Sequence, residues 1–177
     1  MFDADDYGST FMFFDFDFNR QGQKSVSLGY LEISRYLKLP GFDLFEAAVH
    51  YNDGTSLWGR LGPVWLGGIK RDFDLGFFKF SFDLLYRNSY DSNGEDVQII
   101  IAWHESYYDK ITFAGFFDLW TTGETKKKPV ILSEPQIWYN IWNELDVGME
   151  VEITKNFLDS DKFEFMPTIG IKWDFTD

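Results

Sequence analysis

Residues 9–18 read STFMFFDFDF, and this stretch decides the fold class. Phenylalanines and one methionine occupy alternate positions, and two carboxylates, Asp15 and Asp17, stand between the last of them. A period of two residues is the mark of a β-strand, because successive side chains of a strand point to opposite faces. The stretch therefore predicts an amphipathic strand with one apolar face and one polar face.

The same alternation recurs along the chain. It is clear in residues 78–87, 147–154 and 164–175, and weaker forms predict strands at residues 26–39, 42–51, 64–70, 97–104, 111–120 and 130–140. Most of these segments approach the roughly 9–11 residues that a tilted strand needs to cross a bilayer. No segment shows a sustained helical period. We expect an all-β fold of about ten antiparallel strands in one up-and-down domain over residues 1–177.

The connections between these strands alternate in character. Long or polar connections are predicted at residues 19–25, 52–63, 88–95, 121–128 and 157–162, and tighter turns at residues 40–41, 71–76, 107–110 and 141–144. Outer-membrane β-barrels have short turns on the periplasmic side and longer loops outside. On this interpretation both chain termini lie in the periplasm.

Composition excludes several classes of partner. The chain carries 29 acidic and 16 basic residues, a net charge of −13, which argues against a nucleic-acid partner because phosphate binding needs a basic surface. Cysteine is absent, so disulfides and thiolate metal sites are excluded. The mean hydropathy of −0.26 is compatible with a membrane barrel, because such barrels combine polar and apolar faces in each strand.

Alternation leaves the direction of the apolar face open. A soluble lipocalin-type barrel buries this face, whereas a membrane barrel turns it to lipid. Aromatic residues near predicted strand ends, such as Trp58, Trp120 and Trp173, favour the membrane orientation, because amphipathic rings gather at membrane interfaces. Small residues on the polar face, such as Gly148 and Gly170, suit a packed lumen better than an open solvent face.

Five stretches carry a resemblance to a known family: YGSTFMFFDFDFN (7–19), LGYLEISRYLKL (28–39), ITFAGFFDLW (111–120), LSEPQIWYNI (132–141) and FMPTIGIKWDF (165–175). They resemble the nucleoside-specific channel-forming outer-membrane proteins, and most of all an uncharacterised branch of that superfamily in Gram-negative bacteria. The resemblance extends over nearly the whole chain in dispersed segments.

The resemblance implies a monomeric transmembrane β-barrel of twelve strands whose narrow lumen passes nucleosides. Members of the family carry a further strand pair before the position that matches Tyr7, so we expect this chain to lack an N-terminal pair; a ten-stranded barrel is the alternative. The end of the chain resembles the insertion signal of such barrels, with Trp173 and Phe175 as its aromatic residues. Thr176 and Asp177 follow this signal and depart from the pattern.

The polar face supplies the candidate channel-lining and substrate-binding residues. They are Asp15, Asp17, Asp83, Arg87, His104, Phe116, Asp118, Glu134, Gln136, Trp138, Glu150, Glu152 and Lys172. Carboxylates dominate this set, and buried carboxylates are costly unless they are paired or hydrated. We expect a lumen that favours cationic or neutral polar solutes, with a salt-bridged plug as the alternative.

One local feature within this set is unusual. Proline removes a backbone donor and is normally confined to strand edges or bulges, so Glu134-Pro135-Gln136 predicts a bulge that turns Glu134 and Gln136 inward. Trp138 and Phe116 would then stack on a base while Glu134 and Gln136 bind its edge. An ordinary strand irregularity without a ligand is the alternative.

Signs of catalysis are weak. The chain has two histidines, His50 and His104, and contains no zinc-protease motif, nucleophile elbow, phosphate loop or dinucleotide fingerprint. His50 beside the Asn52-Asp53-Gly54 segment is a weak hydrolase signal, and a surface or lumen histidine is the commoner explanation. We therefore expect no enzyme activity, no metal and no cofactor.

The expected function is passive passage of nucleosides or similar small polar solutes across the outer membrane of a Gram-negative bacterium. The expected partners are the lipid bilayer and such a solute, with the chain acting as a monomer or within an envelope complex. A non-conducting structural or accessory barrel is the second hypothesis, and a soluble lipocalin-like carrier is the third.

Overall fold

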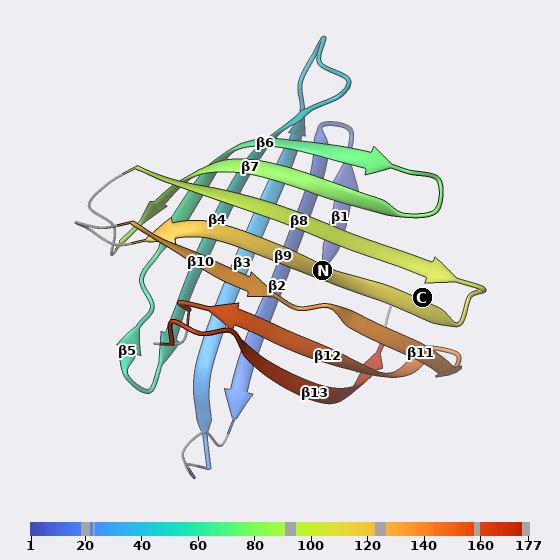
Figure 1. Cartoon of the computed structure of the whole chain (residues 1–177). Coiled ribbons are helices and arrows are strands. Elements are labelled where there is room, and N and C mark those ends of the chain that lie inside the picture. Colours follow the sequence, from blue (N-terminus) through green and yellow to red (C-terminus); the bar gives the residue numbers. More distant parts are fainter. Residues whose placement is uncertain (19–21, 23, 91–94, 123–126, 158–159, 175–177) are drawn as a thin grey trace. The chain divides into compact units, whose positions relative to one another are not determined.

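The computed structural model describes residues 1–18, 22, 24–90, 95–122, 127–157 and 160–174. These residues form a 13-stranded antiparallel sheet (Figure 1). The all-β class predicted from the alternation is therefore confirmed. Within the described part of the chain, no helix has both the length and the apolar character to cross a membrane.

The strands have the following bounds. The first seven are β1 (Phe2–Asp5), β2 (Gly8–Phe18), β3 (Val26–Lys38), β4 (Glu46–Ser56), β5 (Gly59–Arg60), β6 (Val64–Asp74) and β7 (Lys79–Ser89). The other six are β8 (Asp96–Tyr107), β9 (Ile111–Thr122), β10 (Lys128–Ser133), β11 (Gln136–Trp142), β12 (Leu145–Lys155) and β13 (Glu164–Trp173). Every predicted strand is present; β1 and β5 are additional, and the strand predicted at residues 130–140 is divided into β10 and β11.

Strands that follow one another in the chain lie beside one another in the sheet, in the order β1-β2-β3-β4-β6-β7-β8-β9-β10-β12, with β13 beside β12. β10 and β11 both lie between β9 and β12, so these four strands form a ring of pairings. The ring arises because β10 and β11 are consecutive pieces of one strand. Its register is unchanged across the interruption, since Ser133 lies opposite Phe117 and Gln136 lies opposite Ala114.

The strand predicted at residues 42–51 lies later in the chain than expected. Backbone hydrogen bonds from Phe42 to Leu39 and from Phe45 to Phe42 form a turn, so β4 begins only at Glu46. β4 then continues to Ser56, through residues whose Asn-Asp-Gly sequence predicts a loop. The ladder between β3 and β4 extends to Ser56, which lies opposite Leu28, and pairing with the neighbouring strand overrides the local turn preference.

The strands group into two compact units. Unit 1 contains Met1–Arg71 and Asp83–Gln98, and unit 2 contains Asp72–Phe82, Ile99–Thr122 and the described residues after Lys127. Phe175, expected in the terminal aromatic signal, lies outside the described residues, as do residues 123–126 of the predicted connection at residues 121–128.

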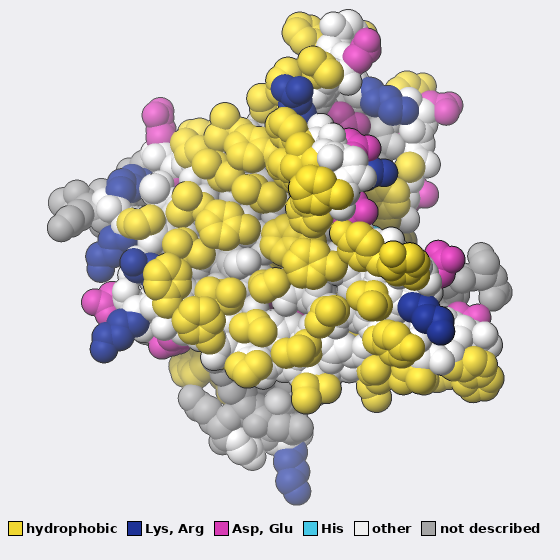
Figure 2. Space-filling model, turned by 45° about the vertical axis from the view of Figure 1, so that its right-hand side comes forward, with side chains coloured by type: hydrophobic (Ala, Val, Ile, Leu, Met, Phe, Trp, Pro, Cys, Tyr) yellow, Lys and Arg dark blue, Asp and Glu magenta, His cyan; other side chains and the backbone are white. Residues whose placement is uncertain are grey.

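Burial is inverted relative to a water-soluble protein. Among the described residues, five hydrophobic side chains are buried, against nine polar or charged side chains such as His50, Asp83 and Gln98. Large hydrophobic side chains are instead exposed on most strands, for example Phe16, Trp65 and Ile169. Figure 2 shows such side chains spread over one face of the molecule, with charged side chains mainly near its margins. Among the described residues, the buried side chains are therefore mostly polar and many large hydrophobic side chains are exposed.

Candidate functional site

Strand register gives unit 1 one polar face. Tyr36, Ser34 and Glu32 alternate along β3, and on β4 they lie opposite Ala48, His50 and Asn52 respectively. The next strand adds Gly68, Leu66 and Val64 to the same rows. Directly opposed residues of paired strands point to the same side of a sheet, so these side chains share one face.

A buried cluster formed by Ser34, Tyr36, His50 and Asp83, here called the His50 cluster, occupies this face. The Tyr36 hydroxyl donates a hydrogen bond to Asp83 Oδ2 at 3.0 Å, and His50 Nε2 lies 3.4 Å from the same oxygen. The rings of Tyr36 and His50 meet edge to face with centroids 5.3 Å apart. His50 and Asp83 are each only 1% exposed, so β3, β4 and β7 are joined by a polar contact that bulk water does not reach.

The His50 cluster is not fully satisfied by protein groups. Nδ1 of His50, Oδ1 of Asp83 and Oδ1 of the neighbouring Asn52 are buried and make no hydrogen bond to any described residue. A buried donor or acceptor without a partner costs about 1–3 kcal/mol. Such atoms are normally satisfied by ordered water or a ligand. The face can therefore accept water or small polar molecules.

Charged groups border the cluster on β3, β4 and β6. The Lys70 ammonium lies 3.3 Å from a Glu46 carboxylate oxygen and 4.7 Å from the centre of the Tyr36 ring. The carboxyl group of Glu32 accepts a hydrogen bond of 3.2 Å from the Tyr30 hydroxyl. Unit 1 thus carries carboxylates and a compensating lysine along one polar surface.

A second polar group, here called the Trp138 cluster, lies in unit 2 and contains Gln136, Trp138, Asn140, Asp146, Glu150 and Lys172. The Trp138 indole N–H donates to Gln136 Oε1 at 3.0 Å, and Gln136 Nε2 donates to Glu150 Oε2 at 2.9 Å. On the other side of the indole, Asn140 Nδ2 donates to Asp146 Oδ1 at 2.8 Å, and Lys172 Nζ lies 3.2 Å from Asp146 Oδ2.

Two glycines make room for the Trp138 ring. Trp138 lies opposite Gly148 on β12, which lies opposite Gly170 on β13. A Cβ atom at Gly148 would stand 2.4 Å from Trp138 Cε3, and one at Gly170 would stand 3.1 Å from Cη2. The indole therefore lies across both strands, and Lys172 Nζ is 5.9 Å from its centre. This arrangement holds the flat indole ring of Trp138 between two groups of polar side chains, Gln136 and Glu150 on one side and Asn140 and Asp146 on the other.

Most of the predicted lining residues lie on these polar faces. Asp83 belongs to the His50 cluster, and Gln136, Trp138, Glu150 and Lys172 belong to the Trp138 cluster. Arg87 donates a hydrogen bond of 2.7 Å to buried Gln98. By register or alternation five further predicted residues share these faces: Asp15, Asp17, Asp118, Glu152 and His104, of which Asp15 and His104 are exposed.

Two parts of the predicted base-binding arrangement do not hold. Phe116 lies four residues from Thr112, the residue opposite Trp138, which is about 13 Å along the strand. Phe116 and Trp138 therefore do not lie opposite each other, as a pair of rings stacked on one base requires. Pro135 interrupts the ladder without inserting a residue, so no bulge reorients Glu134 or Gln136, which by alternation already lie on the same face as Trp138.

Sequence reasoning missed several members of the two clusters. Tyr36 and His50 were not among the candidate lining residues, although each lies two positions along its strand from a polar residue, Ser34 and Asn52 respectively. Asp146, which pairs with the predicted residue Lys172, was also missed. Their shared rows depend on strand register, which the sequence of a single strand does not contain.

No group of three or more His, Asp or Glu side chains within the described ranges is arranged to hold a metal ion.

Comparison with protein families gives one informative match: a model described as a domain of unknown function, DUF5020, matches residues 1–175. Comparison with curated proteins gives no match, and comparison with solved structures gives none either.

Proposed function

We propose that this chain, which belongs to the DUF5020 family of unknown function, is a β-barrel of a Gram-negative outer membrane that passes small polar solutes. Nucleosides are the solute class that we favour. The proposal takes the polar faces of units 1 and 2 as the lining of the lumen and the apolar faces as the surface in contact with lipid.

The inverted burial carries this proposal. In water, an exposed apolar surface costs about 25 cal/mol for each Å² that could have been buried. Monomeric soluble proteins therefore rarely expose large contiguous apolar patches. Here Trp65, Tyr86 and Ile171 are more than half exposed, while Asp83 and Gln98 are buried. A bilayer reverses the cost, because lipid tails solvate the apolar side chains and the polar groups can face a wet lumen.

The continuous strand order is compatible with a barrel. Apart from the short strand β5 and the two pieces β10 and β11, strands that follow one another in the chain pair with one another, as in the up-and-down arrangement of outer-membrane barrels. Most strands have 10–13 residues, close to the roughly 9–11 that a tilted membrane strand requires. Soluble proteins have strands of about 5–6 residues on average.

The chemistry of the polar faces supports a solute that has both a ring and hydroxyl groups. The indole ring of Trp138 can stack on a planar or sugar ring, and Glu150 and Asp146 beside it accept hydrogen bonds. Carboxylates outnumber cations among the proposed lining residues, which disfavours anions. The resemblance of residues 7–19 and 165–175 to nucleoside channels points to the same solute class.

The first experiment tests the membrane barrel. The folded protein should remain soluble only with detergent or lipid, and it should migrate faster on a gel before boiling than after. A chain that stays folded and monomeric without detergent, and whose migration boiling does not change, contradicts a membrane location and favours the soluble carrier.

The second experiment tests conduction. Vesicles containing the protein should swell in isotonic adenosine and not in isotonic raffinose, which is a larger sugar. Trp138→Ala should raise the adenosine concentration needed for half-maximal block of ion conductance by at least about fivefold, the lower range for base–aromatic stacking. Ile137→Ala is the matched control, because Ile137 neighbours Trp138 but lies on the opposite face.

A non-conducting barrel is the second candidate function. Its support is the tight filling of the polar face in unit 1, where His50, Asp83, Leu85 and Ser34 are each at most 2% exposed. A heat-modifiable protein that inserts into vesicles and conducts neither ions nor adenosine would establish this function instead.

A further inference from the structure

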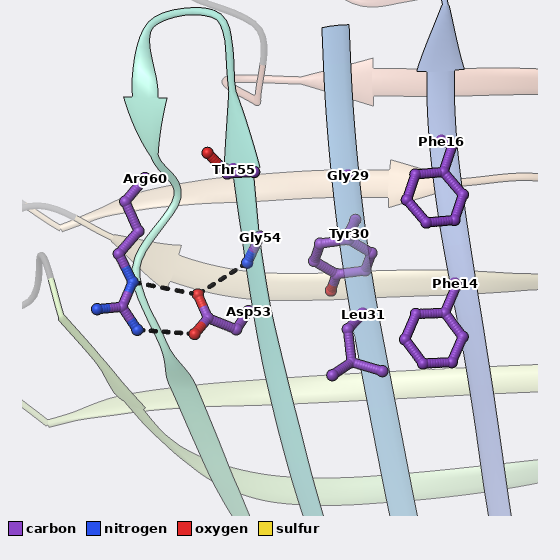
Figure 3. Close-up of a pocket in the computed structure, with 9 residues that line it drawn as sticks. All are labelled: Phe14, Phe16, Gly29, Tyr30, Leu31, Asp53, Gly54, Thr55 and Arg60. Atoms are coloured by element: carbon purple, nitrogen blue, oxygen red, sulfur yellow. Dashed lines mark hydrogen bonds and ion pairs between the residues drawn. The ribbon is translucent and has the colours of Figure 1, made fainter. Parts of the chain in front are cut away.

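The apolar face of unit 1 contains an open depression of about 570 Å³ across β2, β3 and β4 (Figure 3). Phe14, Phe16 and Leu31 form much of its lining. Asp53 and Arg60 stand at one side of it. It therefore combines an apolar floor with a charged border, on the surface that the proposed function assigns to lipid.

Strand register explains why the surface is hollow here. Gly29 lies between Phe16 and Thr55, and in the next row of this face Leu31 lies between Phe14 and Asp53. Gly29 has no side chain, and a Cβ atom there would meet only the Phe16 ring, at 3.5 Å. The missing side chain leaves a gap between Phe16 and Thr55, beside the row that contains Leu31. This gap could receive a hydrocarbon chain.

The charged border is held in place by several hydrogen bonds. Asp53 Oδ2 accepts from Arg60 Nη2 at 2.8 Å and from the Tyr51 hydroxyl at 2.9 Å, and Asp53 Oδ1 accepts from the Gly54 N–H at 2.8 Å. Arg60 Nη1 points away from Asp53 (Figure 3) and makes no hydrogen bond to a residue that the structure describes. The Arg60 side chain is 66% exposed, so its free edge can bind an external anion.

The position along the strands matches a membrane interface. From Gly29 to Leu37 the chain of β3 advances eight residues, about 26 Å at 3.3 Å per residue. A strand tilted by about 35–45° rises about 19–22 Å over this length, which fits within the roughly 25 Å apolar band of outer-membrane barrels, so a bilayer that reaches Leu37 also covers Gly29. Exposed Trp58, two residues before Arg60, is of the type that gathers where lipid headgroups begin.

We propose that this depression binds one anionic phospholipid, with an acyl chain over Gly29 and the headgroup phosphate on Arg60. The inference rests on the proposed membrane location and adds a lipid site to it. Arg60 supplies a charge-assisted hydrogen bond to the phosphate, and Phe14, Phe16 and Leu31 contact the chain. Tyr51 and Gly54 continue to hold Asp53, so Arg60 is presented in a fixed position.

Native mass spectrometry of the detergent-solubilised protein tests this site with phosphatidylglycerol and phosphatidylcholine of identical acyl chains. The wild-type protein should retain one phosphatidylglycerol, at least about tenfold more tightly than phosphatidylcholine. Arg60→Gln should remove this preference. Gly29→Leu should fill the depression and reduce retention of both lipids by a similar factor.

Gly67→Leu is the matched control. Gly67 lies on the same face, opposite Val49, and a Cβ atom there would meet nothing within 4 Å. This variant should retain phosphatidylglycerol as the wild-type protein does. Heat-modifiable migration of each variant shows that it is folded, which separates loss of the lipid site from failure of the membrane proposal.

Three outcomes would overturn the lipid site. They are equal retention of the two lipids by the wild-type protein, unchanged retention in Arg60→Gln and Gly29→Leu, and equal loss in Gly67→Leu and Gly29→Leu. Retention of detergent alone, or a dimer formed through this face, would identify a different occupant and would also reject it.

Discussion

Individual residues in this protein have roles that follow from the inverted burial. His50 and Asp83 would be unusual in the core of a soluble protein of this size, because burying charged groups is costly without full pairing. Here they lie on the same face as Ser34 and Tyr36, with unpartnered atoms that water or solute can satisfy. Substitution of single residues can therefore show which contacts stabilise these buried polar side chains.

Substitution of Asp83 tests the His50 cluster. Asp83→Ala removes the acceptor of the Tyr36 hydroxyl and should lower the free energy of unfolding by about 1–3 kcal/mol. Asp83→Asn keeps an oxygen acceptor and should cost less than half as much. The measurement is the urea midpoint in lipid vesicles; equal losses in both variants would mean that charge, and not the hydrogen bond, stabilises the cluster.

Substitution of Gly148 tests the seat of the Trp138 ring. Gly148→Ala places a methyl group 2.4 Å from both Trp138 Cε3 and the Ile137 carbonyl oxygen, so it should destabilise the protein by about 1–3 kcal/mol. It should also shift tryptophan emission to longer wavelength as the indole is displaced. Gly170→Ala, whose closest contact is a looser 3.1 Å, should have the smaller effect. An equal or larger effect at Gly170 would contradict the described position of the ring.

At the scale of the element, the division between β10 and β11 is a local distortion in an otherwise continuous strand. Pro135 has no N–H, and yet Glu134 N–H donates to the Phe116 carbonyl and Val151 N–H donates to the Pro135 carbonyl. The unchanged register on both sides places Gly115 opposite Pro135. Gly115 adopts a φ of +148°, a region that side chains other than glycine rarely occupy.

We therefore expect Gly115, more than Pro135, to be required for the distorted backbone between β10 and β11. Gly115→Ala brings a Cβ atom to 2.4 Å from the Glu134 carbonyl oxygen and forces a strained φ, so a loss of about 1–3 kcal/mol is expected. Pro135→Ala removes no hydrogen bond and should change stability by less than about 0.5 kcal/mol. Urea unfolding of the two variants in vesicles checks this order, and a larger loss in Pro135→Ala would reverse our account of which residue sets the geometry.

The sequence predicts elements far better than it predicts their contacts. Alternation located every long strand, because the period of two is written into each segment. It misplaced the start of β4, where Phe42 and Leu44 continue an apolar pattern through a turn. It predicted one strand over residues 130–140 with a bulge at Glu134-Pro135-Gln136, whereas the strand is interrupted there without an inserted residue. Register decides the second point, and register depends on partner strands that are distant in sequence.

At the scale of the whole molecule, the same limitation applies to the candidate site. Lining residues such as Asp83, Trp138 and Glu150 were identified from their face alone. Tyr36, the partner of Asp83, could be grouped with it only once the strands were paired, whereas Gln136 was already grouped with Trp138 from the sequence. The direction of the apolar face was also open in the sequence, and the exposed hydrophobic side chains are the observation on which our membrane proposal rests.

A charged substitution on the apolar face provides the whole-molecule prediction. Ile169 on β13 is 88% exposed, so in a soluble protein Ile169→Arg should change stability by less than about 0.5 kcal/mol. In a bilayer the same change should cost about 2–4 kcal/mol if the residue lies near the midplane. Thr168→Arg, on the opposite face beside Glu150, is the control and should be nearly neutral. Urea titration in vesicles that leaves both variants equally stable would argue against lipid contact at Ile169.

The sequential strand order has a consequence for assembly. Because β2 pairs with β3 and β3 pairs with β4, each hairpin can close as soon as its own residues are present. Proteins dominated by contacts that are local in sequence fold faster than those that must first bring distant segments together. The order of pairing would let the chain be threaded through a narrow opening as an unfolded polypeptide and rebuilt hairpin by hairpin on the far side.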